Sequence, residues 1–171
     1  MQRLNLPAAT ALLCLLSVAT INANAQDATQ PPSNEHPVLT LEGRGVQIYA
    51  CQPPVSGNAA PQWTFVAPAA RLFDGENEVG THGDGPVWQY QDGSSIHGQL
   101  AAKSTPDATA IPWLLLKGIN PGRPGVLAKV EYIRRSNPKG GLAPTTGCDK
   151  DHALTLAQVP YTATYTFYSS K

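Results

Sequence analysis

The stretch VPYTATYTFY, residues 159–168, shows the clearest two-residue alternation in the chain. One face carries Tyr161, Ala163, Tyr165 and Phe167, and the other carries Thr162, Thr164 and Thr166. Successive side chains of a β-strand point to opposite faces, so this pattern predicts a strand with one apolar face. A sheet that buries this face against a core is therefore the starting point for the rest of the chain.

Working outward from this segment, short strand-like runs recur between turn residues. Residues 46–51 alternate with a period of two, residues 111–119 are apolar as in a central strand, and residues 126–133 alternate again. Asp92-Gly93 is the strongest hairpin signal. No window of ten residues or more carries a helical period with caps. About eight or nine short strands predict a single all-β domain, either an antiparallel β-sandwich or a closed β-barrel.

The first 25 residues differ from the rest of the chain and predict a secretory signal peptide. Arg3 supplies the positive charge, residues 8–21 form the apolar core, and Ala23 and Ala25 fit the small residues of a cleavage site. The apolar core is too short to span a membrane. We therefore expect a secreted or periplasmic protein that has no membrane span after cleavage.

Cys14 suggests an alternative, because a lipoprotein signal places its lipidated cysteine at the end of the apolar stretch. Here Leu15 and Leu16 continue the apolar run, which favours a plain signal core. Cleavage leaves Cys51 and Cys148, and in an oxidising compartment these two predict one intramolecular disulfide. Two free thiols or a metal pair are the alternatives, although neither cysteine has a second Cys or a His at ligand spacing.

The mature chain is expected to consist of a flexible N-terminal tether, residues 26–42, and one β-domain, residues 43–171. Removing residues 1–25 leaves 146 residues, a size typical of a single domain. The whole chain has 12 Lys and Arg against 12 Asp and Glu, and only Arg3 lies in the removed segment. The mature charge is therefore close to −1, which argues against nucleic acid or an anionic membrane as the main partner.

Several strings of the chain occur together in a known family. They are GVQIYAC (45–51), APAARLFD (67–74), GTHGDGPVWQYQDGSSIHG (80–98), IPWLLL (111–116), EYIRR (131–135), GGLAPTTGCD (140–149) and VPYTATYTFY (159–168). Together they resemble a family of small exported proteins of bacteria and fungi that is known only as a domain of unknown function. The resemblance implies an exported single domain without an established activity. Some members carry a malate dehydrogenase label, but this chain has neither a Gly-x-Gly-x-x-Gly after a strand nor an alternating βα pattern.

Candidate ligand-binding residues concentrate in the polar segment around residues 80–92. His82 and Asp84 place an imidazole beside a carboxylate, and the glycines around them allow a close approach of the backbone to a ligand. Trp88 follows as the tryptophan best placed for partial exposure and for stacking on a flat ligand. For each residue taken singly, a role in a glycine-rich turn or in the core is the simpler interpretation.

Arg134 is the fourth candidate ligand-binding residue. The alternation over residues 126–133 places it on the face of Val130 and Tyr132, with Arg135 pointing the other way. That face is interpreted as the inner one, where an unpaired charge is costly. An inward Arg134 would serve either as one half of a structural ion pair or as a ligand anchor.

No set of residues in the chain stands out as a catalytic constellation. The favoured hypothesis is a non-enzymatic exported domain that binds a glycan, a small molecule or an envelope component, with no cofactor and no resident metal. The alternative is a hydrolase or metal-dependent enzyme that uses His82, Asp84 and Asp92. A structural component of the envelope or matrix is the third hypothesis.

Overall fold

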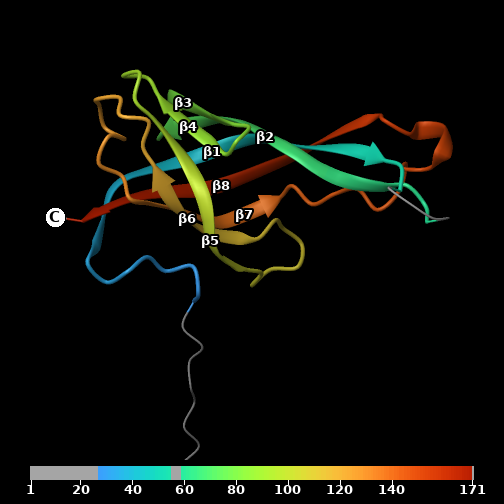
Figure 1. The fold of residues 1–171 in the computed structure, drawn as a ribbon, viewed down its shortest axis with the longest axis horizontal. Helices are drawn as coiled ribbons and strands as arrows, with labels where there is room; N and C mark the ends of the chain where they lie inside the picture. The colour runs from blue at the N-terminus through green and yellow to red at the C-terminus, as the bar shows by residue number, and fades with distance from the viewer. Residues whose placement is uncertain (1–26, 55–58, 171) are drawn as a thin grey trace, which may run out of the picture.

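The computed structural model describes residues 27–54 and 59–170, so the predicted signal peptide and Cys14 lie outside the described residues. Eight strands make up almost all of the regular structure (Figure 1). In chain order they are β1 (Glu35–Gln52), β2 (Gln62–Asp74), β3 (Asn77–Gly83), β4 (Val87–Tyr90), β5 (Ser95–Ser104), β6 (Trp113–Ile119), β7 (Tyr132–Gly140) and β8 (Leu156–Ser170). Within these ranges the only helix is the 3-10 turn η1 (Lys150–His152), and no helix is long and apolar enough to cross a membrane.

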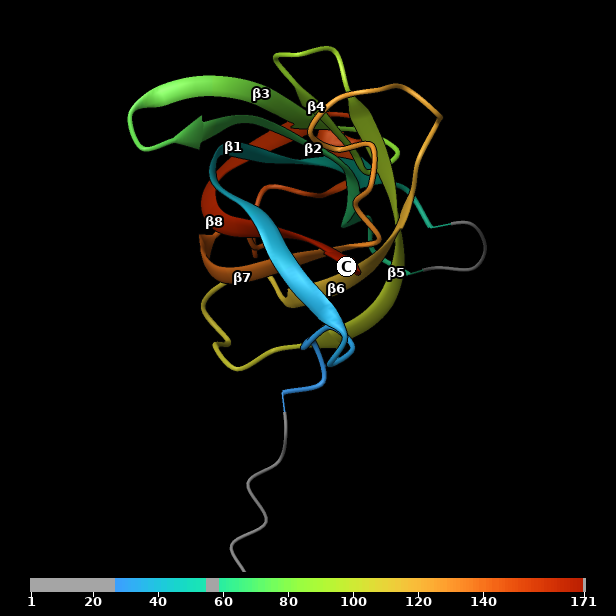
Figure 2. The same ribbon diagram turned by 90° about the vertical axis from the view of Figure 1, so that its left-hand side faces the viewer.

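The eight strands form one closed antiparallel barrel. Each strand pairs with the next along the chain, and β8 pairs with β1 to close the ring (Figure 2). This confirms the predicted all-β domain and its antiparallel strands, and the arrangement is the closed one. The ring is uneven, because β2 pairs with β3 only over residues 70–74 and β5 pairs with β4 only over residues 95–97. Residues 62–69 of β2 therefore pair with β1 alone.

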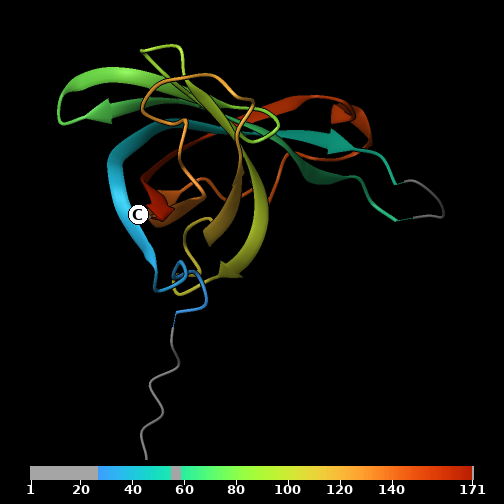
Figure 3. The same cartoon turned by 60° about the vertical axis from the view of Figure 1, so that its left-hand side comes forward.

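The two ends of the barrel differ, because three strands are longer than the other five and extend beyond one end. Strands β1, β2 and β8 have 18, 13 and 15 residues, whereas no other strand exceeds 10. Their extra length projects beyond the ring together with the β7–β8 connection. These parts form an arm, made of residues 49–52, 62–65 and 141–158 (Figures 1 and 3). The C-terminal ends of odd strands and the N-terminal ends of even strands all meet at this end of the barrel, which we call the arm end.

The interior is filled by side chains that alternate inward along each strand. In β8 the predicted apolar face is buried and the threonine face is turned away from the core. The largest fully buried side chains come from β1, β2, β4, β5, β7 and β8 and from one loop: Leu41, Leu72, Trp88, Ile96, Leu127, Ile133, Tyr165 and Phe167. Each contributes about 1.5–3 kcal/mol of apolar burial, which makes this cluster the main stabilising element.

The end opposite the arm is closed by a loop, where the sequence predicted part of a strand. Residues 126–129 form turns, residues 130 and 131 have no regular structure, and β7 begins only at Tyr132. The loop folds back because the Asn120 side chain donates to the carbonyls of Leu127 and Ala128, at 3.0 and 2.6 Å. Leu127 and Val130 are thereby buried in the barrel core. Residues 120–131, which we call the plug loop, thus close this end of the barrel.

The start of the domain also differs from the expected boundary. β1 begins at Glu35, so residues 35–42 of the expected tether are part of the longest strand. The alternation that defines this strand was obscured by a β-bulge, since Pro37 pairs with Tyr168 and Leu39 with Phe167, leaving Val38 unpaired.

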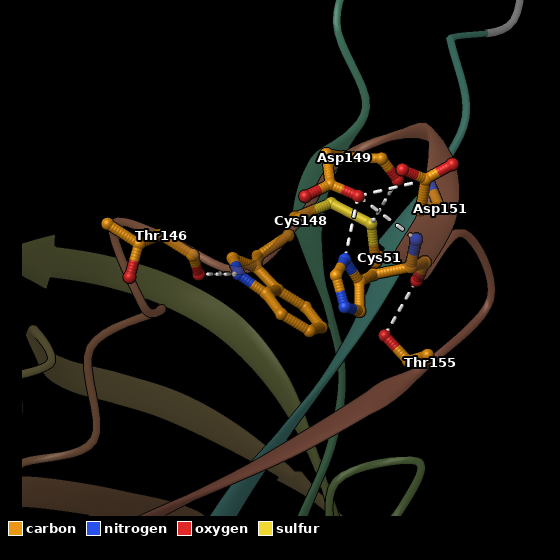
Figure 4. Close-up of a disulfide and its surroundings, with 8 residues drawn as sticks. Cys51, Thr146, Cys148, Asp149, Asp151 and Thr155 are labelled. Carbon is orange, nitrogen blue, oxygen red and sulfur yellow. Dashed lines mark hydrogen bonds and ion pairs between the residues drawn. A yellow bond between two sulfur atoms is a disulfide. The ribbon is translucent and has the colours of Figure 1, made fainter.

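The disulfide lies on the arm, far from the barrel core. Cys51 of β1 is bonded to Cys148, with 5.3 Å between their Cα atoms, which confirms the predicted pairing (Figure 4). Asp149 caps η1 by accepting from the backbone N–H groups of Asp151 and His152. The 141–155 segment is held against β1 by the bridge and by two backbone hydrogen bonds, from the Cys51 N–H to the Thr155 carbonyl and from the Leu154 N–H to the Cys51 carbonyl.

Candidate functional site

A cavity of about 620 Å³ opens at the arm end of the barrel. Its volume lies within the range of about 300–1,000 Å³ that is typical of small-molecule sites. Every one of the eight strands contributes to its lining, and so do the β3–β4 turn and the β5–β6 loop. An eight-stranded barrel is wide enough to hold one small ligand when its side chains leave one end unfilled. The cavity is therefore the interior of the barrel itself and not a crevice between loops.

The mouth of the cavity is apolar. Ile48 pairs with Ala67 and Tyr49 with Phe65, so Val66 is an extra, bulged residue in β2. The bulge turns both Phe65 and Val66 toward the cavity, although consecutive strand residues normally face opposite sides. Both side chains remain about half exposed. They form an apolar rim where the arm leaves the barrel.

An aromatic cluster forms the floor of the cavity. The His82 ring of β3 stacks on the Trp88 indole of β4, with centroids 4.3 Å apart and planes 9° from parallel. The Tyr165 ring of β8 meets both rings edge-on, at 5.1 and 5.6 Å. Glycines make room for this packing: a Cβ at Gly43 would lie 2.5 Å from the Tyr165 ring, and one at Gly98 would lie 2.9 Å from the Trp88 ring.

His82 is neutral in this cluster. Its side chain is only 4 % exposed, and burial lowers the pKa of its imidazole from 6.5 to about 4. The Nδ1 atom lies 2.9 Å from the Val87 carbonyl oxygen, which can only accept. Nδ1 therefore carries the proton and donates, and Nε2 keeps its lone pair as an acceptor.

Arg135 brings a positive charge into the cavity lining. The residue is 9 % exposed, and its Nε and Nη2 atoms both donate to the Pro112 carbonyl, at 3.0 and 2.9 Å. Burial raises the pKa values of the Tyr161 and Tyr165 hydroxyls, and the Arg135 charge acts on both in the opposite direction. The guanidinium thus lies among the phenols at the base of the cavity.

Two buried N–H groups on residues that line the cavity have no acceptor. Gln47 of β1 and Trp88 are almost completely buried, yet the Gln47 Nε2 and the Trp88 Nε1 find no hydrogen-bond partner among residues 27–54 and 59–170. The neighbouring hydroxyls of Tyr161 and Tyr165 bond to each other, at 3.0 Å. A buried N–H without an acceptor costs about 1–3 kcal/mol. Neither nitrogen is exposed to the cavity, so the two groups are a cost of packing the floor and are not open to a ligand.

Three of the four candidate residues from the sequence meet in this cavity. His82 and Trp88 form its floor, and Asp84 lies exposed at the rim in the β3–β4 turn. His82 belongs to β3 and not to the glycine turn. Trp88 is 1 % exposed, which agrees with the core role that was the simpler interpretation and excludes partial exposure.

Arg134 lies outside the cavity, and the predicted face was wrong. Because β7 begins at Tyr132, the inward face is that of Ile133 and Arg135. Arg134 packs over the Trp113 ring at 4.9 Å and pairs with Asp27, with 2.5 Å between Nη2 and Oδ2. Arg134 is thus in a structural ion pair, with an acid from the N-terminal segment.

Asp92, the third residue of the enzyme hypothesis, lies in the β4–β5 turn and is not part of the cavity lining. Its Oδ1 accepts from the Ser94 N–H and hydroxyl, at 2.8 and 2.6 Å, and its Oδ2 accepts from the Val126 N–H at 2.8 Å. It therefore ties the plug loop to the barrel. Among the described residues, no group of three or more His, Cys, Asp and Glu side chains is placed to hold a metal ion.

Sequence reasoning missed Gln47, Phe65, Val66 and Arg135 as members of the site. A local signal existed for Arg135, because the apolar Ile133 shares its parity. Gln47 gave no such signal, since it lies between the apolar Val46 and Ile48 and reads as an outward residue.

A comparison with known proteins completes the description of the chain. A family model, described as Protein of unknown function (DUF3455), matches residues 31–169. This range contains all eight strands except the last residue of β8, together with the whole cavity lining. No curated protein and no solved structure matches the chain. The chain therefore belongs to the family of proteins of unknown function called DUF3455.

Proposed function

We propose that this chain is an exported binding protein that holds a small, largely apolar ligand in the barrel cavity without transforming it. The observation that carries the proposal is the cavity itself, which is open at the arm end, closed by the plug loop at the other and lined by all eight strands. Its apolar rim, with one charged side chain, Arg135, in an otherwise mostly apolar lining, has the features of a small-molecule site.

Export is supported by residues outside the barrel. The charged start, apolar core and small cleavage residues of the first 25 positions fit a secretory leader. The disulfide fits an oxidising compartment, where such bonds persist. The proposed cleavage leaves Gln26 as the first residue, directly before the Asp27 that pairs with Arg134.

The test uses protein purified from the exported fraction, whose intact mass should correspond to a chain that begins at Gln26. Binding is measured with the neutral dye N-phenyl-1-naphthylamine, which fluoresces more strongly in an apolar site. Val66→Trp should weaken dye binding about tenfold or more, because the larger side chain occupies the mouth of the cavity and blocks the entry of the dye. The proposal fails if wild-type protein does not bind the dye or any of the carboxylate probes below.

Val38→Trp is the matched control for this experiment. Val38 and Val66 are both unpaired residues at β-bulges, and their exposed fractions are 51 % and 49 %. Val38 does not line the cavity. Equal loss of dye binding in the two variants would contradict a site in the barrel mouth.

A further inference from the structure

The charge balance around Arg135 narrows the class of ligand. All 12 Asp and Glu residues of the chain lie within the described ranges. The ion pairs that they form with arginines involve Arg44, Arg71 and Arg134, and none involves Arg135. Asp84 shares the cavity lining but does not approach the guanidinium closely enough to pair with it. Arg135 is thus a buried cation whose negative partner the described chain does not supply.

The polar groups that Arg135 offers to a ligand are all donors. A guanidinium has five N–H groups, and the Pro112 carbonyl accepts from Nε and Nη2. The lining therefore combines one buried positive charge, Arg135, with an apolar mouth, and Lys103 adds a second, exposed cation. A buried charge without a counter-charge is costly, and a carboxylate at the guanidinium relieves that cost.

We propose that the cavity binds an amphiphilic carboxylate, with the carboxylate at Arg135 and the apolar body directed past Phe65 and Val66 toward the arm. This inference rests on the proposed function, since it assigns the polarity of the ligand for the same cavity. The carboxylate accepts from the guanidinium in the protein interior, where such charge-assisted hydrogen bonds are strong. Because Phe65 and Val66 are half exposed, the rim does not limit the length of the apolar body. Both an alkyl chain and a ring system therefore fit.

Three competitors with the same ten-carbon chain test the charge preference. Decanoate, 1-decanol and decylammonium are titrated below their micelle concentrations against the bound neutral dye at pH 7, and decanoate is also titrated directly by calorimetry. Decanoate should compete about tenfold better than decanol or more, as expected for a charge-assisted hydrogen bond, and decylammonium should be the weakest. A parallel titration with 2-naphthoate distinguishes a ring body from a chain body.

Arg135→Met tests the assigned residue, and Arg134→Met is its control. The two arginines are neighbours on β7, but Arg134 lies outside the cavity lining. Arg135→Met should abolish the preference for decanoate over decanol while keeping dye binding, and Arg134→Met should leave the preference unchanged. Arg135→Lys keeps the charge but not the guanidinium, and should retain part of the preference for decanoate over decanol. If Arg135→Met does not fold, an undiminished preference in Arg135→Lys contradicts the assignment.

The outcomes separate this inference from the proposed function. Equal competition by decanoate and decanol, or an undiminished preference in Arg135→Met, overturns the carboxylate assignment while the binding function stands. Absence of binding for the dye, decanoate and 2-naphthoate alike overturns both proposals. A lower affinity for the dye and for all competitors alike in Arg135→Met would show that Arg135 only shapes the cavity, which also contradicts its role as the carboxylate partner.

Discussion

The barrel and the arm share three strands but are stabilised in different ways. In the barrel, Trp88, Ile133 and Phe167 are packed in a continuous apolar core. In the arm, the apolar side chains of Leu154 and Leu156 are exposed. The arm is held by the strand pairing of β1 with β2 and β8, by the disulfide and by single side-chain hydrogen bonds. Examples are the Trp63 Nε1, which donates to the Thr146 carbonyl at 2.9 Å, and the Tyr49 hydroxyl, which donates to the Gly141 carbonyl at 2.6 Å.

This difference explains where the cavity lies. A fully packed barrel leaves no space for a ligand, and an arm without a core cannot enclose one. At their junction the strands already enclose a volume, while the side chains no longer fill it. The rigid floor of His82, Trp88 and Tyr165 belongs to the barrel, whereas the apolar rim of Phe65 and Val66 belongs to the start of the arm.

Removing the disulfide would test whether the arm stabilises only itself. Cys51 and Cys148 are 97 residues apart, and the segment between them contains β2 to β7. The bridge therefore restrains most of the unfolded barrel. The double variant Cys51→Ser, Cys148→Ser should lose up to about 4–5 kcal/mol of unfolding free energy in urea titrations. A loss below about 1 kcal/mol, with faster hydrogen exchange confined to the arm, would show that the bridge acts only locally.

A pair of tryptophan substitutions compares the two regions directly. Trp88→Ala removes a buried ring from the barrel core and should cost about 3–5 kcal/mol. Trp63→Ala removes a partly exposed ring and one hydrogen bond from the arm and should cost about 1 kcal/mol. Urea midpoints followed by far-UV circular dichroism measure both changes. Equal losses would mean that the arm is part of the cooperative core, contrary to the proposed division.

The fold class could be predicted because strand alternation is a local property. The two faces of β8 are visible in residues 159–168 alone, and the barrel buries the predicted one. The hairpin at Asp92-Gly93 is equally local, and Gly93 adopts the positive φ of 85° that a tight turn requires. Boundaries set by distant contacts were not predictable. Residues 126–131 alternate like a strand but belong to the plug loop, because Asn120 and Asp92 bind them from elsewhere in the chain.

The candidate site could be predicted only in part, for a related reason. His82, Asp84 and Trp88 are close in sequence and stay close across the β3–β4 hairpin. Gln47, Arg135 and the rim come from strands that meet only when the barrel closes. Alternation also does not say which face of a strand becomes the interior. In β1 the polar Gln47 points inward, because this stretch of the interior is a cavity with polar groups and not packed core.

The last prediction concerns the pH dependence of stability, to which the buried His82 of the barrel should contribute. Burial lowers its pKa from 6.5 to about 4, so below pH 6.5 the unfolded chain binds a proton that the folded chain does not. This contribution to stability is complete above pH 6.5 and is lost as pH falls to about 4, in total about 3 kcal/mol. His82→Phe keeps a ring on Trp88 and should flatten urea midpoints over this range. His152→Gln, which removes an exposed imidazole from the arm, is the control, and an unchanged slope in His82→Phe would show that His82 is protonated inside the folded barrel.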